Sequence, residues 1–542
     1  MQGLMQDYPL TIQHVLWRCE RLFRSKEIVS QREQGVVHRY TYPDLIERAG
    51  RLAGSLRRLG VGPGDRVGTL AWNNYRHLEA YYAVPCMGAV LHTLNLRLPS
   101  DQLAFIIEDA GDGVILVDAS LIPVLERVRD RIPSVRSVIV MSDGAVPDHG
   151  LGEVLDYEEL IAAESPDFPW PSLDEQAAAG MCYTSGTTGN PKGVVYTHRS
   201  QLLHSMAILM GDGIAIREQD SVLPVVPMFH VNSWGIPYGA GLAGAKLVFP
   251  DRFMGDAGVL IDLADAEDVT LMAGVPTVWM NVAARLRETG RRLPHVRVGV
   301  GGGSAMPPAL IETMDGLGLP ALHAWGMTEM SPIGTAAVVR SWIPEDRVAE
   351  TRASQGVPSV LVETRIADLG TGEELPWDGV AFGELQVRGP WIASRYFHDA
   401  DPERFTADGW LGTGDVATID PDGYVRIVDR TKDVIKSGGE WIGSVELEGM
   451  IMAHPKVREA AVIGLAHPKW AERPVAYVVP AEGQEASLTK DEILEFLSGK
   501  VPRFWLPDDV RFIEEVPKTT VGKFDKKVLR ATALPLPGQP VT

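Results

Sequence analysis

Cysteine is scarce in this sequence. The 542 residues include three cysteines, Cys19, Cys86 and Cys182, which lie far apart along the chain. That number and spacing exclude a disulfide framework and a zinc site built from cysteine pairs, so a reducing compartment is the simplest expectation. We expect Cys182 to belong to the core.

The sequence pattern predicts neither a targeting segment nor a membrane span. The N-terminal stretch MQGLMQDYPLTIQHVL has neither the basic start nor the apolar run of a secretory signal. Residues 221–245 carry no formal charge and could span a bilayer by length, but Pro224, Pro227, Pro237 and the polar His230 interrupt them, and proline breaks a spanning helix. We therefore expect a cytoplasmic protein in which residues 221–245 are buried and line a pocket.

Positive charge is in short supply. The chain has 51 Lys and Arg against 71 Asp and Glu, a formal net charge of −20 at pH 7. Because affinity for a nucleic-acid backbone depends on cationic surface, this balance argues against nucleic acid as a partner. An anionic ligand must instead find a local positive site.

The pattern that is present is that of an α/β protein. Through the first four hundred residues apolar helical periods alternate with short β-branched runs, so that residues 100–110 predict a helix capped by Ser100 and ended by Gly111, and residues 113–118 predict a buried strand. Residues 412–433 predict two strands joined by a turn at 420–423. The chain beyond predicts a compact α+β unit of roughly a hundred residues.

We therefore expect two domains and a hinge. The predicted boundaries are 1–429 for a large compound domain, 430–433 for the hinge and 434–542 for a small α+β domain. The large domain is expected to contain mixed sheets with helices layered on them and a small β-barrel-like part. A chain of this length exceeds a single compact core.

The stretch YTSGTTGNPKG, residues 183–193, is typical of a site for a bound anion. Main-chain N–H groups in a loop of small residues can approach a phosphate because no Cβ blocks them, and hydroxyls add donors. The loop is not the P-loop of common NTPases, since Pro191 stands where its second glycine is required and Gly193 follows the lysine. Residues 299–303 also fail the dinucleotide fingerprint, because Ser304 or Met306 occupies the closing glycine position. A flexible surface turn is the competing interpretation of such a loop.

Four further motifs decide between these interpretations. GMTEMSP from Gly326, GWLGTGD from Gly409, VDRTKDVIKSGGEWI from Val428 and TTVGKFDKKVLR from Thr519 follow in order. Together with the loop they resemble the adenylate-forming superfamily, which includes acyl-CoA synthetases, peptide-synthetase adenylation domains and luciferases, over essentially the whole chain. The text around VVPMFHVNSW, LMAGVPTVW and IKSGGEWIGSVELE is most similar to bacterial medium- and long-chain fatty-acyl-CoA synthetases.

The resemblance implies two reactions in one pocket. A carboxylate is a poor electrophile, so it first attacks the α-phosphorus of ATP, releases pyrophosphate and leaves an acyl-adenylate. The thiol of coenzyme A then displaces AMP. The first step brings anions together, so catalysis is expected to depend on positioning and on cations around the phosphates.

The resemblance also assigns the nucleotide site. It implies that the β- and γ-phosphates are bound by the loop residues Thr184, Ser185, Gly186, Thr187, Thr188, Gly189 and Lys192. A magnesium ion is implied at Thr184 and Glu329, and hard oxygen ligands suit it. The resemblance also implies that the walls of the adenine and α-phosphate site are formed by Gly302, Gly303, Ser304, Trp325, Gly326 and Thr328. Trp325 is the expected stacking ring, although a lone tryptophan is usually a core residue, and Asp415 with Arg430 is expected to bind the ribose.

Catalysis and domain movement are implied for the C-terminal part. Lys523 is expected to reach the carboxylate and the α-phosphate while charge develops between them; its competing interpretation is membership of a solvated basic run. Lys432 is the expected hinge residue, with Asp433 as the alternative. Lys436 is expected to contact the adenylate, and Gly438 with Gly439 is expected to admit the pantetheine arm.

The residues of the acid pocket are assigned from their positions in the sequence alone. Candidates are His230, Val231, Trp234 and residues 275–277, with a satisfied buried histidine as the alternative for His230. Trp441 follows SGGE where related long-chain enzymes carry a gating tryptophan, so it is expected to block the acyl tunnel until ATP binds. A short, branched or sulfur-containing acid, such as one like methylthiopropionate, is the alternative substrate.

Other function classes stay open at this stage. An amino-acid adenylation domain would need an acidic pocket residue and a carrier domain downstream, and the sequence ends without one. A luciferase-like oxygenase shares the first step. A non-enzymatic nucleotide-binding module would tolerate loss of Lys523, Glu329 or Asp415, and all three are present. A homodimer that involves the N-terminal segment is expected from the resemblance.

The role of Lys523 can be tested by substitution. Removal of one preorganised donor to a developing oxyanion typically costs about 100- to 1000-fold in rate. We therefore predict that Lys523→Ala abolishes acid-dependent pyrophosphate exchange and spares thiolysis of a supplied acyl-adenylate. Equal loss of both half-reactions would refute this role.

Overall fold

The structure is a computed structural model that describes residues 1, 3–184, 190–438, 440–518 and 524–536. The predicted site residues Ser185, Gly186, Thr187, Thr188, Gly189, Gly439 and Lys523 lie outside the described residues. The chain divides into two compact units. The first comprises Met1–Glu363 and Val387–Leu411, and the second comprises Thr364–Gln386 and Gly412–Thr542.

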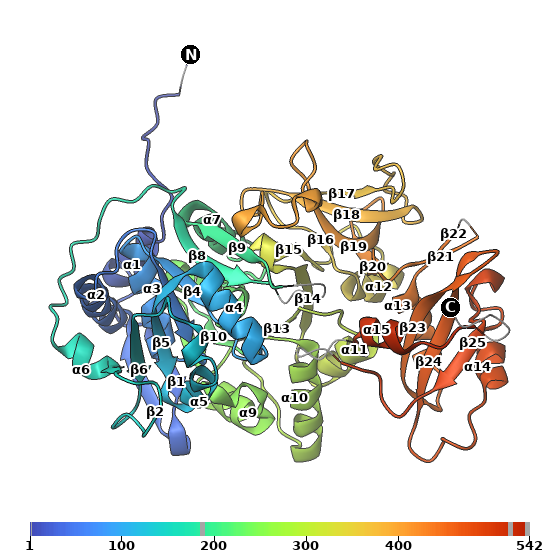
Figure 1. Cartoon of the computed structure of the whole chain (residues 1–542), viewed down its shortest axis with the longest axis horizontal. Coiled ribbons are helices and arrows are strands. Elements are labelled where there is room, and N and C mark those ends of the chain that lie inside the picture. The colour runs from blue at the N-terminus through green and yellow to red at the C-terminus, as the bar shows by residue number, and fades with distance from the viewer. Residues whose placement is uncertain (2, 185–189, 439, 519–523, 537–542) are drawn as a thin grey trace. The chain divides into compact units, whose positions relative to one another are not determined.

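Two large sheets belong to the described part of the first unit (Figure 1). One sheet has the order β16 (Val357–Pro358), β15 (Ile333–Ala336), β14 (Ala321–Gly326), β13 (Val298–Gly301), β12 (Leu271–Gly274), β10 (Ser221–Pro224), β11 (Lys246–Phe249), β1 (Glu27–Gln31) and β2 (Val37–Thr41). The other has the order β7 (Leu155–Asp156), β6 (Ser137–Met141), β5 (Asp112–Asp118), β3 (Arg66–Leu70), β4 (Val90–Thr93), β8 (Ala178–Tyr183) and β9 (Gly193–Thr197). Both are mixed sheets, because parallel strands fill their centres and antiparallel pairs lie towards their ends.

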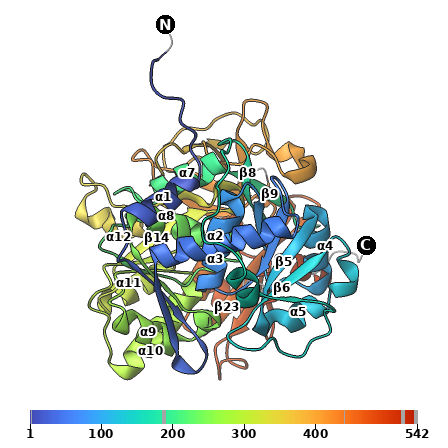
Figure 2. The same cartoon turned by 90° about the vertical axis from the view of Figure 1, so that its left-hand side faces the viewer.

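Helices are layered on these sheets, as the α/β pattern predicts. Those of the first unit are α1 (Gln13–Arg21), α2 (Tyr42–Arg58), α3 (Tyr75–Cys86), α4 (Ser100–Ala110), α5 (Ile122–Glu126), α6 (Tyr157–Ala162), α7 (His198–Ala207), α8 (Ile236–Ala243), α9 (Ala257–Ala266), α10 (Pro276–Thr289), α11 (Pro308–Gly316) and α12 (Val348–Ala353). Every residue of α3 is buried, and its hydrophobic cluster includes side chains from both sheets. Figure 2 shows α2 and α3 side by side. This packing joins the two sheets into one core.

The predicted helix at residues 100–110 is present, but its predicted cap is wrong. Ser100 is the first helical residue, and the extended Pro99 precedes it without a side-chain cap. Proline fixes φ near the value seen at helix entries, so the chain enters the helix one residue earlier than a serine cap requires. Gly111 ends the helix with φ +67° and β5 follows, both as predicted.

The uncharged stretch 221–245 is divided among several elements. It forms β10, a short turn over Val231–Gly235 and α8, and most of its side chains are buried, which confirms the prediction of a buried segment. Among the described residues, helices long and apolar enough to cross a membrane do not occur. Cys182 is buried in β8, as expected.

Two smaller sheets lie wholly or mainly in the second unit. One has the order β17 (Glu363–Ala367), β18 (Phe382–Arg388), β19 (Leu411–Ile419) and β20 (Val425–Arg430). The other has the order β22 (Glu440–Ile442), β21 (Ile435–Ser437), β24 (Ala471–Pro480) and β23 (Val457–His467), and β25 (Asp509–Phe512) pairs with β24. Its helices are α13 (Ser444–Met452), α14 (Lys490–Leu497) and α15 (Lys526–Thr532). The predicted hairpin and the predicted α+β unit are confirmed.

The predicted domain boundary lies inside the second unit rather than at its start. The main-chain N–H of Ser444, at the start of α13, donates to a carboxylate oxygen of Asp429 in β20 at 2.5 Å. Residues on either side of 430–433 therefore pack together, and the second unit includes Thr364–Gln386 and the stretch from Gly412 onward, all before the predicted boundary. Hinge action at residues 430–433 stays a prediction.

A buried carboxylate pair lies where strands of both sheets end. The side-chain amide of Asn74 donates to Asp118 at 3.2 Å and to Asp251 at 3.5 Å, and the Trp72 N–H donates to Asp118 at 2.6 Å. Arg32 lies 3.6 Å from Asp251. Burial raises the pKa of both aspartates, and the charge of Asp118 raises the pKa of Asp251 further.

These raised pKa values predict a pH dependence of stability. Between about pH 4, where an unfolded aspartate loses its proton, and the raised folded pKa values, the folded state binds more protons than the unfolded state. The free energy of unfolding must therefore fall as pH rises through this window, by about 1.4 kcal/mol for each unit of raised pKa. Asp118→Asn should flatten the pH dependence of the urea midpoint between pH 4 and 8, whereas Asn at the exposed Asp148 should not. An unchanged slope in Asp118→Asn would contradict this assignment.

Candidate functional site

Several predicted residues lie where parallel strands of one sheet end. Strands β10, β12, β13 and β14 are neighbours and run parallel. Ligands of such sheets bind outside the carboxyl ends of the strands. Residues 275–277 follow β12, residues 302–304 follow β13, and residues 325–328 end or follow β14. The topology thus gathers the predicted nucleotide walls and the predicted acid pocket at one edge.

The two ends of the glycine loop are joined. The Thr184 N–H donates to the Lys192 carbonyl at 2.9 Å, and the Lys192 N–H donates to the Thr184 hydroxyl at 3.3 Å. Thr184 and Lys192 flank β8 and β9, which pair antiparallel. The described ends of the loop are therefore closed by backbone pairing.

Edge strand β9 connects the loop to the motif that contains Glu329. The Tyr196 hydroxyl donates to the Thr328 carbonyl at 2.7 Å, and both residues are buried. This hydrogen bond links the sheet that carries the loop ends to the segment that follows β14. The described loop ends, Thr184 and Lys192, and the segment that contains Glu329 are thus brought into one region of the first unit.

Glu329 is held by residues 393–396. Its carbonyl accepts the Ala393 N–H at 2.7 Å, and its Oε1 accepts a short hydrogen bond from the Tyr396 hydroxyl. Burial raises the pKa of Tyr396 well above the usual range for tyrosine, and the neighbouring Glu329 raises it further. The phenol is therefore protonated at neutral pH and is the donor.

Lys192 has a carboxylate partner. Its ammonium forms an ion pair with Asp401 and lies 5.3 Å from the centre of the Tyr396 ring. Burial lowers the pKa of Lys192, and the positive charge of Arg404 adds to this effect. A phosphate at this lysine would have to replace or share the Asp401 contact.

Glycines of the predicted adenine wall are in close contacts. A Cβ on Gly302 would lie 2.8 Å from the Ala324 carbonyl oxygen and 3.1 Å from the Trp234 ring. A Cβ on Gly326 would collide with the Pro332 carbonyl. Only glycine fits at either position. The Trp325 ring is half-buried and lies against Gly334, and Gly303 and Ser304 are exposed.

The predicted acid pocket contains a turn of unusual conformation. Val231, Asn232, Ser233 and Trp234 all have φ between +46° and +56°, and Gly235 has φ +72°. Non-glycine residues rarely adopt this region, and they keep it only where the surroundings fix them. The turn presents buried Val231 and half-buried Trp234, while His230 before it is half-buried.

Polar side chains anchor this turn to its neighbours. The Asn232 Oδ1 accepts from the Cys182 thiol at 3.2 Å and the Thr93 hydroxyl at 3.4 Å, both in the other sheet. The Ser233 hydroxyl donates to the Val226 carbonyl at 2.8 Å. Asn232 and Ser233 are therefore engaged within the protein, and the role of the apolar Val231 and Trp234 in an acid pocket stays a prediction.

The predicted ribose residues lie together in the second unit. Asp415 and Arg430 are directly opposed in the β19–β20 pair, and the Arg430 Nε lies 2.9 Å from Asp415 Oδ1. The Asp415 carboxylate is almost fully buried, with 5% of its side chain exposed, whereas Arg430 is 45% exposed. The arginine therefore orients one oxygen of the carboxylate.

The predicted adenylate and gate residues occupy one hairpin of the second unit. Lys436 and Trp441 are paired across β21 and β22, and the ammonium lies 5.1 Å from the indole centre. Gly438 has φ +64°, and a Cβ there would lie 2.8 Å from the Trp470 ring. Lys432 is exposed. The roles of these residues stay predictions.

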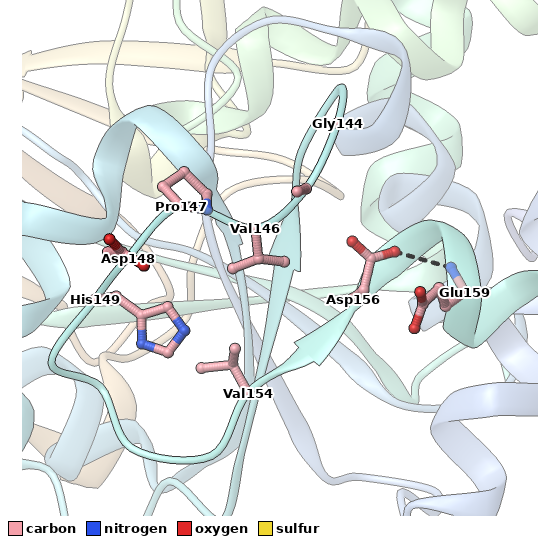
Figure 3. A pocket seen from close by; sticks show the side chains of 9 residues that line it. Gly144, Val146, Pro147, Asp148, His149, Val154, Asp156 and Glu159 are labelled. Carbon is pink, nitrogen blue, oxygen red and sulfur yellow. Dashed lines mark hydrogen bonds between the residues drawn. The ribbon is translucent and has the colours of Figure 1, made fainter.

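Two of the hollows in the described surface of the first unit differ in whether predicted or newly identified site residues line them. One of about 700 Å³ is lined by residues 144–149, Val154, Asp156 and Glu159, and Figure 3 shows the Asp156 carboxylate accepting the Glu159 N–H. None of the predicted site residues lines it. The other, of about 610 Å³, lies between β9 and residues 390–399, and Ser331 and Tyr396 line it.

Sequence reasoning missed Tyr396 and Asp401. Both lie in RYFHDADPERF, which the five motifs do not include, and a tyrosine among aromatic neighbours is ordinarily interpreted as core. Their importance arises from contacts with Glu329 and Lys192, which are distant in sequence. The signal available in the sequence was that residues 395–405 form a polar stretch without a strand pattern, which favours a loop that can carry functional residues.

The donor set suits a hard divalent cation. Mg²⁺ commonly takes one or two carboxylates together with substrate phosphates, rather than a complete protein cage. Glu329 offers a carboxylate and Thr184 offers a hydroxyl. Groups of three or more His, Cys, Asp or Glu side chains that could hold a metal do not occur in the described part of the chain. A cation here would therefore take some of its ligands from the protein and the others from bound phosphates.

Comparison with known proteins gives matches along most of the chain. Residues 18–397 match the family described as AMP-binding enzyme, and residues 446–523 match the AMP-binding enzyme C-terminal domain. The chain is 45% identical to a 3-methylmercaptopropionyl-CoA ligase of Ruegeria lacuscaerulensis over 98% of either chain. It is 47% identical to a long-chain-fatty-acid–CoA ligase of Thermus thermophilus over 97% of this chain and 96% of that protein.

A solved structure is also similar. ATP-bound MatB from Rhodopseudomonas palustris is 26% identical, with a TM-score of 0.82 over 97% of this chain and 99% of that chain. The expected fold class, with a large α/β domain and a small α+β domain, is thereby confirmed.

Proposed function

The chain belongs to the AMP-binding enzyme family and is an acyl-CoA ligase that uses ATP and coenzyme A through an acyl-adenylate, and we propose that its acid substrate is a medium- or long-chain fatty acid. The products are then the fatty acyl-CoA, AMP and pyrophosphate. The observation that carries the acid assignment is the left-handed turn at Val231–Trp234. Its polar side chains are bonded within the protein, so its apolar side chains are left for the substrate.

An apolar acid fits this environment on physical grounds. Val231 is 4% exposed, and the Trp234 ring packs against Gly302, which belongs to the proposed adenine wall. Carboxylate side chains do not occur among the described residues proposed for the pocket, His230, Val231, Trp234 and 275–277. An ammonium group on the substrate would therefore lack a partner, which argues against an amino acid.

The phosphates are proposed to bind at the loop and its lysine. Lys192 would neutralise the β- and γ-phosphates, with main-chain N–H groups of the loop as further donors. Glu329 and Thr184 would bind Mg²⁺, which when present neutralises charge on the phosphates. In the second unit, Asp415 would accept the ribose hydroxyls while Arg430 fixes its orientation.

The second half-reaction is proposed to use another arrangement of the C-terminal part. Lys523 would act in adenylation, and rotation about Lys432 would then bring Gly438 and Gly439 to the pantetheine arm. Lys436 would contact the adenylate, and Trp441 would close the acyl tunnel before ATP binds. A homodimer in the cytoplasm remains part of the proposal. These assignments follow from motif positions.

A sulfur-containing short acid is the second candidate. It is favoured by the 45% identity to the Ruegeria lacuscaerulensis 3-methylmercaptopropionyl-CoA ligase, which is close to the 47% identity to the Thermus thermophilus fatty-acid enzyme. A thioether is apolar and would suit the same pocket wall. The two candidates differ in the depth of pocket that they require.

A chain-length series separates these candidates. Each buried methylene contributes about 0.8 kcal/mol, so kcat/KM for AMP release should rise about fourfold per methylene from butyrate until the pocket is filled. We predict a maximum between octanoate and palmitate, with 3-methylthiopropionate slower than octanoate. A maximum at 3-methylthiopropionate, with decline for every longer acid, would contradict the fatty-acid assignment.

A further inference from the structure

We propose that Tyr396 is a positioning residue for the divalent cation, which fixes the carboxylate of Glu329 in the orientation that the metal–ATP complex requires. This inference rests on the proposed function, because it takes Glu329 as the cation ligand. Tyr396 lies outside the motifs that predict the site. Its role follows from its contacts alone.

The contacts on Glu329 come from two points of one segment. Tyr396 donates its hydroxyl to Oε1 of Glu329, and the Ala393 N–H donates to the Glu329 carbonyl at 2.7 Å. Tyr396 is 2% exposed and Glu329 is 5% exposed. The segment therefore fixes both the main chain and the side chain of the glutamate, away from bulk water.

A single donor to one carboxylate oxygen determines where the other oxygen points. A carboxylate is planar, so a hydrogen bond to Oε1 restricts rotation of the whole group. Partners of this kind orient metal ligands, and their loss typically costs about 10- to 100-fold in metal affinity. Without the hydroxyl, the Glu329 carboxylate would lose this restraint on its rotation. It would also lose one of the hydrogen bonds that offset the cost of its burial.

The position of the Tyr396 ring is set independently of its hydroxyl. Phe405 packs against it edge-on, with ring centres 5.4 Å apart, and the Lys192 ammonium lies 5.3 Å from the ring centre. A phenylalanine at this position keeps both contacts. Tyr396→Phe therefore removes the hydrogen bond to Glu329 and little else.

The same ring connects the proposed cation ligand to the proposed phosphate lysine. Lys192 is held over the ring by its ion pair with Asp401. Asp401 binds the Lys192 ammonium, whereas the Glu329 carboxylate accepts from Tyr396. The two variants Tyr396→Phe and Asp401→Asn should therefore affect different parts of the nucleotide complex.

The experiment compares ATP binding with and without the metal. Calorimetric titration of the full chain with ATP, in EDTA and in saturating Mg²⁺ without acid or coenzyme A, gives the factor by which Mg²⁺ tightens binding. We expect Tyr396→Phe to reduce this factor by about tenfold or more, while its metal-free ATP affinity stays within twofold of wild type. The Mg²⁺ concentration for half-maximal pyrophosphate exchange should rise in parallel.

Tyr42→Phe is the matched control. Tyr42 is also buried, and its hydroxyl donates at 2.7 Å to the Ala245 carbonyl, which is not among the proposed nucleotide or cation residues. It loses an equivalent hydrogen bond that does not reach Glu329 or its neighbours in sequence, so its Mg²⁺ factor should equal that of wild type. Asp401→Asn should tighten ATP binding equally in EDTA and in Mg²⁺, because it removes a competitor for Lys192.

A double-mutant cycle completes the test. If Tyr396 acts through Glu329, Tyr396→Phe should leave the Mg²⁺ factor unchanged in a Glu329→Gln background. A wild-type Mg²⁺ factor in Tyr396→Phe, or an equal loss with and without metal, would overturn this inference alone. If wild type itself binds ATP equally in EDTA and Mg²⁺, the proposed cation site fails together with it.

Discussion

The seam between the two large sheets of the first unit is the constraint on which the site depends. The Tyr196 hydroxyl on β9 bonds to the Thr328 carbonyl after β14, and Asn232 in the left-handed turn bonds to Cys182 in β8. Each hydrogen bond joins a loop of one sheet to a strand of the other. The described loop ends Thr184 and Lys192, the segment around Glu329 and the turn at Val231–Trp234 are brought together by these contacts. Because these contacts are buried, water does not compete for them.

The electrostatics of an acidic protein require that positive charge be concentrated at the site where the anionic substrates meet. The chain carries a net charge of −20, and its reaction brings a carboxylate to a polyphosphate. The ammonium of Lys192 is already paired with Asp401, and burial lowers the pKa of Lys192. At the proposed phosphate site, a nucleotide would therefore exchange partners with an existing ion pair instead of binding to a free cation. This arrangement would limit the desolvation that binding requires.

The sequence predicts the elements well where the pattern is local. The helix at residues 100–110, the hairpin within residues 412–433 and the compact α+β unit beyond it follow from periodicity and turn chemistry. The cap at Ser100 was wrong because Pro99 sets the entry to the helix. Motifs located the glycine loop, Glu329 and Asp415. Tyr396 and Asp401 could not be found in this way, since their roles depend on contacts with residues far away in the chain.

The account depends on formation of an acyl-adenylate before any thiol takes part. Its most direct test is mass spectrometry of the purified protein incubated with ATP, Mg²⁺ and decanoate in the absence of coenzyme A. The account predicts decanoyl-AMP and pyrophosphate in equal amounts, both dependent on the acid. Absence of acyl-AMP with decanoate and with every other aliphatic acid tried would contradict it.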